Sequence, residues 1–148
     1  DFNLFQSGHR RYDQTQLNAW DDNLAAEGNF GEDSWRYVER EYARTLIKPV
    51  LDGEPSYEWV VQGLHDDSQP YWKAADVRRY AYWSVFAGAA GHTYGHNSIM
   101  QFYGDLSVPG AFGAKYLWMD AIHHSGGAQM IYLKKLMESV NYTEGRPS

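Results

Sequence analysis

The chain has 148 residues, with 13 Lys and Arg against 19 Asp and Glu, for a net charge of −6 and a pI near 5.4. This acidic balance argues against a nucleic-acid or anionic-membrane partner, since both require clustered basic residues. No apolar run approaches the ~20 residues of a membrane-spanning helix, and the lack of Cys excludes disulfides and thiolate chemistry.

Aromatic residues are unusually frequent: six Trp, twelve Tyr and six Phe make up 16% of the chain. Tyr and Trp combine an apolar plate with a polar edge, which suits the CH faces and hydroxyl rims of sugars. Packing in a core or an interface is the competing interpretation for most of them.

The first half of the chain predicts two strands and two helices. Alternating apolar and polar residues over Phe2–Gln6 indicate a half-buried strand. A short helix is predicted over Leu17–Ala26, and Ser34 is placed to cap a second helix over Trp35–Thr45. The aliphatic run Ile47–Leu51 then predicts a buried strand.

The second half predicts three more helices and one more strand. Ala74, Val77, Ala81 and Val85 form a helical stripe. The remaining predictions are a strand that opens into a site loop over His92–Tyr103, and helices over Ala114–His124 and Ala128–Val140 separated by Gly126-Gly127.

This alternation of strands and helices predicts an α/β fold with parallel strands and right-handed crossovers. Three strands are few for that class, so the sheet is expected to be incomplete. An unrelated small α+β domain is the alternative. We expect one domain over residues 1–148.

The segment Asp52-Gly53-Glu54-Pro55 places a carboxylate directly after the second predicted strand. Gly53 permits a sharp change of direction, and Pro55 disfavours the helical conformation at Glu54. In barrel enzymes the carboxyl ends of strands form the catalytic face. An ordinary Asp-Gly turn is the competing interpretation.

Polar residues follow all three predicted strands, as expected for a site at one end of a parallel sheet. The first strand is followed by Gln6, Ser7 and His9, the second by Asp52, Glu54 and Glu58, and the third by His92, Tyr94, His96, Asn97 and Gln101.

The histidines favour hydrogen bonding to a ligand over metal binding. His92 and His96 are four residues apart, but Gly91 and Gly95 interrupt a helix there and no Glu lies between them. A structural role is the alternative, and His123-His124 is interpreted as a surface or packing feature. We therefore expect no metal and no cofactor.

Glycosidic hydrolysis requires two carboxyl groups, one to donate a proton and one to attack or to activate water. Within this chain the candidate partners for Glu54 are Asp52 and Glu58. Neither is a convincing second site carboxylate, because Asp52 is expected in the wall of the sheet.

Four segments resemble the apiosidase-like glycoside hydrolases, which include glycoside hydrolase family 140. The segments are Phe2–His9, Lys48–Glu58, Asp76–Trp83 and Ala87–Asn97. The resemblance implies the C-terminal portion of a (β/α)8 barrel, about strands six to eight. It also implies retaining hydrolysis of plant-polysaccharide side chains such as an apiose linkage.

By the same resemblance, Glu54 occupies the nucleophile position and the general acid ends the fourth strand, upstream of Asp1. His9, Asp52, Glu58, Tyr94, His96, Asn97 and Gln101 fall where the family lines its pocket. Tyr94 or His96 is expected to orient Glu54. The piece is expected to associate with itself or with the missing N-terminal part of the barrel, and relatives imply export from the cell.

The alternative function is a non-catalytic carbohydrate-binding or interaction module that keeps the aromatic plates without the chemistry. A covalent adduct on Glu54 would distinguish the enzyme from the module.

Overall fold

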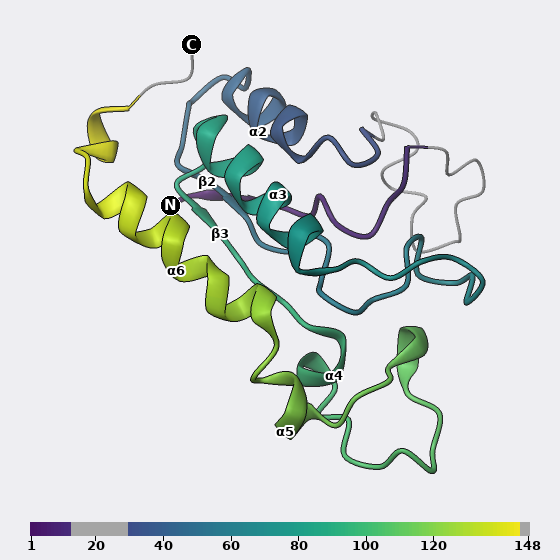
Figure 1. Cartoon of the computed structure of the whole chain (residues 1–148). Helices are drawn as coiled ribbons and strands as arrows, with labels where there is room; N and C mark the ends of the chain where they lie inside the picture. The colour runs from purple at the N-terminus through teal and green to yellow at the C-terminus, as the bar shows by residue number, and fades with distance from the viewer. Residues whose placement is uncertain (13–29, 146–148) are drawn as a thin grey trace.

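The computed structural model describes residues 1–12 and 30–145, which form a parallel sheet flanked by helices (Figure 1). The sheet has the order β1-β2-β3, and Asp52 is paired with both Phe5 and His92. The strands are β1 (Asn3–Phe5), β2 (Val50–Asp52) and β3 (Gly91–His92).

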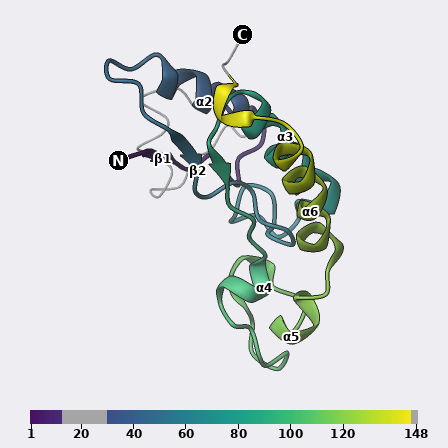
Figure 2. The ribbon, with the colours of Figure 1, turned by 90° about the vertical axis from the view of Figure 1, so that its left-hand side faces the viewer.

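Helices cover one face of this sheet, and two short helices lie beyond the end of β3 (Figure 2). The covering helices are α2 (Ser34–Tyr42), α3 (Ala74–Phe86) and α6 (Ser125–Glu138). The short ones are α4 (Asn97–Met100) and α5 (Trp118–Ala121), and 3-10 turns occupy Ala111–Gly113 and Tyr142–Glu144.

The three parallel strands and their covering helices confirm the predicted α/β class and fit part of a (β/α)8 barrel. Phe5, on the covered face, stacks on Tyr37 of α2 with ring centroids 5.7 Å apart. Leu4 points to the other face and is 61% exposed. In the part of the chain described, that face therefore lacks the apolar cover it requires.

Two small cores hold the helices and loops in place. The first joins Phe5 and Val50 of the sheet to Tyr37 and Val38 of α2. The second, formed by Val60, Trp72 and Tyr80, lies under the loop that leads from β2 into α3. This second core gives the loop after β2 a fixed conformation, which matters because Glu54 belongs to that loop.

Two of the early elements differ from their predicted limits. Ser34 is the first residue of α2 rather than its cap; Asp33 is the N-cap, and neither makes a side-chain capping bond. Strand β2 begins at Val50, because Ile47 is 69% exposed and does not join the sheet. The helix predicted over residues 17–26 lies outside the described residues.

The later elements differ more. The third strand ends at His92, and α4 lies inside the segment predicted as strand and loop. Of the helix predicted over 114–124, only α5 forms. Helix α6 begins at Ser125, so the two glycines expected to separate helices lie in its first turn.

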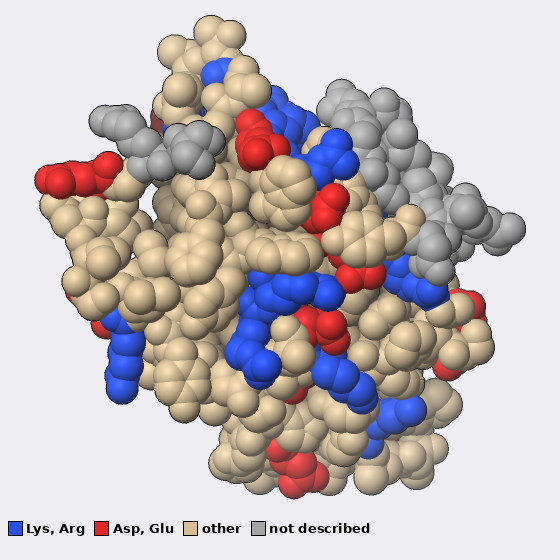
Figure 3. All heavy atoms as spheres, turned by 45° about the horizontal axis from the view of Figure 1, so that its top comes forward, with Lys and Arg blue, Asp and Glu red and all other residues tan. Residues whose placement is uncertain are grey.

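The surface mixes both signs of charge. On the face seen in Figure 3, basic and acidic side chains lie side by side rather than forming a basic tract. Arg79 of α3, for example, pairs with Glu32 at 2.7 Å. No helix in residues 1–12 and 30–145 is long and apolar enough to cross a membrane.

Candidate active site

Glu54 lies just beyond the carboxyl end of β2, where its carboxylate meets the end of β1. The Gln6 side-chain amide donates to Glu54 Oε1 at 2.9 Å, and His9 Nε2 lies 3.5 Å from the same oxygen. The side chain of Glu54 is 44% exposed, whereas that of His9 is 5% exposed. The carboxylate is thus held from the protein side and open on the other.

The backbone after β1 wraps closely around the backbone after β2. The Gly8 N–H donates to the Glu54 carbonyl at 2.9 Å, and a Cβ on Gly8 would lie 2.5 Å from the Pro55 carbonyl carbon. His9 has a φ of 73°, a strained value for a residue with a side chain. Its N–H donates to Ser56 Oγ at 2.9 Å, which holds the imidazole beside Glu54.

Asp52 lies apart from Glu54, on the face of the sheet covered by α3. Its Oδ2 accepts hydrogen bonds from Ser7 at 2.6 Å and from Ser84 of α3 at 2.9 Å, and the residue is fully buried. Desolvation raises the pKa of Asp52 to about 6, partly offset by the two serine hydroxyls. Asp52 therefore fastens β1, β2 and α3 together.

His92 is the neighbour of Asp52 on β3, with Nδ1 3.8 Å from Oδ2. Burial lowers the pKa of His92 to about 4. The imidazole is therefore neutral wherever Asp52 is ionised, so this contact is not an ion pair.

Glu58 and Tyr94 meet at the first turn of α6. The Tyr94 hydroxyl donates to Glu58 Oε2 at 2.7 Å, and Glu58 is only 2% exposed. A Cβ on Gly126 would overlap that carboxylate. A carboxylate at a helix N-terminus is favoured by the helix dipole, so this pair anchors the start of α6.

His96 pairs with His124, the N-cap residue of α6. His96 Nδ1 accepts from the Ser98 N–H, so its Nε2 carries the proton and donates to His124 Nδ1 at 2.9 Å. Burial first, and then His124, lower the pKa of His96 to about 4. In the described part of the chain, the polar partners of Glu54 are Gln6 and His9 rather than Tyr94 or His96.

Asn97 and Gln101 bind the backbone of neighbouring loops. Asn97 donates to the carbonyls of Trp59 and Phe112 at 2.9 and 2.8 Å. Gln101 donates to Asn97 Oδ1 and exchanges hydrogen bonds with the backbone of Ala111. Their polar atoms are committed to holding the segment that ends in the 3-10 turn at Ala111–Gly113.

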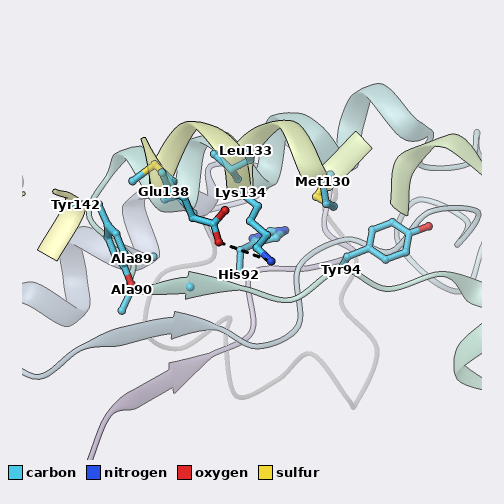
Figure 4. Close-up of a pocket in the computed structure, with 12 residues that line it drawn as sticks. Ala89, Ala90, His92, Tyr94, Met130, Leu133, Lys134, Glu138 and Tyr142 are labelled. Carbon is cyan, nitrogen blue, oxygen red and sulfur yellow. Dashed lines mark ion pairs between the residues drawn. The ribbon is translucent and has the colours of Figure 1, made fainter. Parts of the chain in front are cut away.

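A cavity of about 400 Å³ lies between β3 and α6, away from Glu54 (Figure 4). Met130 and Leu133 of α6 line it from one side, and His92 and Tyr94 line it from the other. Lys134 and Glu138 form an ion pair at 3.7 Å at its edge. Because its walls are mostly apolar, we interpret this cavity as incomplete packing between β3 and α6 rather than as a polar binding site.

The predicted site residues therefore fall into separate groups. Of the predicted site residues, only His9 lies against Glu54. The other residue that bonds Glu54 is Gln6, which was not in the predicted pocket set. Its signal was available, since Gln6 is the first polar residue after a predicted strand. Among residues 1–12 and 30–145, no three His, Asp or Glu side chains are grouped to hold a metal ion.

Known families and structures match nearly all of this chain. The family model described as "Apiosidase-like, catalytic domain" matches residues 1–144. A solved structure titled "Glycoside hydrolase" is 56% identical, with a TM-score of 0.86. A glycoside hydrolase family 5 structure from Bacteroides vulgatus ATCC 8482 is 50% identical, also with a TM-score of 0.86.

The chain spans about a third of those structures. The alignments cover 97% of this chain in both cases, but 32% of the first solved chain and 30% of the second. No curated protein matches. With the family model matching from the first strand to the last turn, the chain belongs to the apiosidase-like catalytic-domain family.

Proposed function

We propose that this chain supplies the catalytic nucleophile, Glu54, of a retaining glycoside hydrolase that acts on side chains of plant-type polysaccharides. Family membership and the glycoside hydrolase structures support the reaction class. The observation that carries the residue assignment is the half-exposed Glu54 carboxylate, held at the carboxyl end of β2.

The two contacts of Glu54 suit a nucleophile. Both Gln6 and His9 meet Oε1, and no residue in the described part of the chain bonds Oε2. Oε2 is therefore the atom with free lone pairs. The Gln6 amide on Oε1, with His9 beside it, fixes the orientation of the carboxylate.

In the proposed reaction, Glu54 Oε2 attacks the anomeric carbon while a carboxylic acid protonates the departing glycosidic oxygen. The product of this step is a glycosyl ester of Glu54. Water then attacks the same carbon, the former acid removes its proton, and Glu54 leaves as carboxylate. The two carboxyl groups of a retaining enzyme are about 5–5.5 Å apart.

We infer that the acid/base carboxylate comes from a part of the barrel outside this chain. Asp52 and Glu58, the candidates nearest in sequence, are 0% and 2% exposed and are bonded to serines or to Tyr94. Neither can reach a leaving group beside Glu54. Their pocket roles are therefore indirect: each fixes an element on which the site rests.

The partner of this chain is, in this proposal, the remainder of the barrel, and its ligand is a carbohydrate. β1 and β3 each pair with β2 alone, so each presents one unpaired edge in the described part of the sheet. A further parallel strand beside each edge would continue the sheet. His9, Tyr94, His96, Asn97 and Gln101 then shape the rim of the site, with His9 the one next to the reacting carbon.

The test is the Glu54→Gln variant of the complete protein, assayed on an aryl apioside. We expect kcat to fall by roughly 10⁴-fold or more, while binding of the glycoside remains measurable by calorimetry. Glu39→Gln, an exposed change on α2, is the matched control and should keep full activity. Unchanged turnover in Glu54→Gln would remove Glu54 from the mechanism; saturable binding without turnover by the unaltered protein would favour the binding module.

A further inference from the structure

Tyr57 lies on the loop after β2, three residues after Glu54 in the sequence and next to His9 in space. Its ring meets the imidazole of His9 edge to face, with centroids 5.1 Å apart. The side chain also packs against the core formed by Val60, Trp72 and Tyr80. It is thus held by His9 and by this core but is not fully buried.

Gly95 provides the space that this ring occupies. A Cβ on Gly95 would overlap the Tyr57 ring, although its backbone conformation is one that other residues adopt readily. The Glu58 N–H donates to the Gly95 carbonyl at 2.9 Å, and Glu58 pairs with His96 as in a parallel ladder. These bonds hold Tyr57 against Gly95, so the glycine is required by close approach rather than by flexibility.

The hydroxyl of Tyr57 has no hydrogen-bond partner within the described part of the chain. No residue in 1–12 or 30–145 donates a hydrogen bond to it or accepts one from it, unlike the hydroxyl of Tyr94. Burial, followed by the charges of Glu54 and Asp52, raises the pKa of Tyr57. The phenol therefore stays protonated at neutral pH, and its O–H can donate a hydrogen bond to a ligand near Glu54.

We propose that Tyr57 is a specificity-determining residue that forms the wall of the sugar site at Glu54, positioned there by Gly95. Its ring would contact the CH groups of the sugar attacked by Glu54, and its hydroxyl would donate to a hydroxyl or ring oxygen of that sugar. This inference rests on the proposed function of Glu54 and deepens it by naming the residue that recognises the glycosyl ring.

The experiment is a double-mutant cycle at Tyr57 and Gly95 in the complete protein, read as kcat/KM on an aryl apioside. Tyr57→Ala and Gly95→Ala should each lower kcat/KM by roughly tenfold or more. Once Tyr57 is Ala, adding Gly95→Ala should change little, because there is no ring left to displace. Tyr57→Phe keeps the wall and should lose only the part due to the hydroxyl.

Gly104→Ala is the matched control, since a Cβ there meets only one backbone oxygen, at 3.6 Å. It should leave kcat/KM unchanged. Fully additive losses in the cycle, or a Tyr57→Ala variant as active as the parent, would overturn the role of Tyr57.

A second measurement separates this inference from the nucleophile assignment. Glycoside binding in the Glu54→Gln background should weaken when Tyr57→Ala is added. If Glu54→Gln leaves turnover intact, the nucleophile assignment fails, whatever the cycle gives. If Glu54→Gln abolishes turnover while Tyr57→Ala changes neither binding nor kcat/KM, only the role of Tyr57 fails.

Discussion

The carboxylate of Asp52 and the hydroxyl of Ser84 are 2.9 Å apart, although 32 positions separate them in the sequence. Asp52 therefore faces the helix layer, two residues before a carboxylate that faces the open end of the sheet. The short Asp-Gly-Glu segment contains one structural and one exposed carboxylate, and only the exposed one can meet a substrate.

The stability of Asp52→Asn relative to the parent protein is predicted to rise with pH. Burial raises the pKa of Asp52 from 3.8 to about 6, so ionisation favours the unfolded chain. The destabilisation of the parent by ionised Asp52, which Asp52→Asn removes, is absent below pH 3.8. It grows between pH 3.8 and about 6, and is fully present above pH 6. It is on the order of 3 kcal/mol.

Thermal unfolding of the complete protein at pH 4 and pH 8 measures this difference. The midpoint of Asp52→Asn relative to the parent should be higher at pH 8 than at pH 4. Asp67→Asn, an exposed change in the loop after β2, is the control and should show no such trend. An Asp52→Asn difference that is the same at both pH values would contradict the burial argument.

Replacing Gln6 is predicted to impair catalysis more than stability. Gln6→Ala removes the 2.9 Å donor to Glu54 Oε1 and should lower kcat roughly tenfold, since hydrogen bonds to charged groups are among the stronger ones. Gln6→Glu should be worse, because a second carboxylate replaces the donor and repels the carboxylate of Glu54 out of its orientation.

Kinetics on an aryl apioside across pH 4 to 8 provide the readout. Gln69→Ala, which removes an amide bonded to Asp66 in an exposed loop, is the matched control. A kcat in Gln6→Glu as high as that of the parent would show that Gln6 does not act on Glu54.

Gly126→Ala is predicted to destabilise the protein through Glu58. A Cβ at this position would overlap the Glu58 carboxylate, whereas one on Gly127 would meet the Tyr94 ring at 3.0 Å or more. Ala is intrinsically better than Gly in a helix by about 1 kcal/mol. Gly127→Ala should therefore be nearly neutral and Gly126→Ala clearly destabilising.

The cause can be isolated by adding Glu58→Ala. The additional cost of Gly126→Ala in the thermal midpoint should then disappear, because the overlapping carboxylate is gone. Equal costs for Gly126→Ala with and without Glu58 would assign the effect to something other than this contact.

The order of elements was predictable because it depends on local patterns. Alternation over Phe2–Gln6, the stripe from Ala74 to Val85 and the aliphatic run before Asp52 each indicate their element without tertiary information. Their limits were less predictable, since burial decides them. Ile47 has the right composition for a strand, but it is 69% exposed and lies outside the sheet.

The start of α6 shows why the rest could not be predicted. Two adjacent glycines normally weaken a helix, so the sequence favours a break at Gly126-Gly127. In the structure they open the first turn, because Glu58 and Tyr94 pack where side chains at those positions would stand. That reason lies in residues far away in the chain.

The position of Glu54 at the end of the second strand was predictable, but its contacts were not. A carboxylate after a buried strand, flanked by Gly and Pro, indicated Glu54 and the end of the sheet. The partners of Glu54 are 48 and 45 positions away in sequence, and only the register of β1 against β2 brings Gln6 and His9 to it. The same register turns Asp52 towards α3.

The most direct measurement is mass spectrometry of the complete protein after incubation with a 2-deoxy-2-fluoro glycosyl inactivator of the retaining type. The account predicts one glycosyl adduct, located on the peptide that contains Glu54 and absent from Glu54→Gln. An adduct on another carboxylate, or none while the protein still hydrolyses an aryl apioside, would contradict Glu54 as the nucleophile.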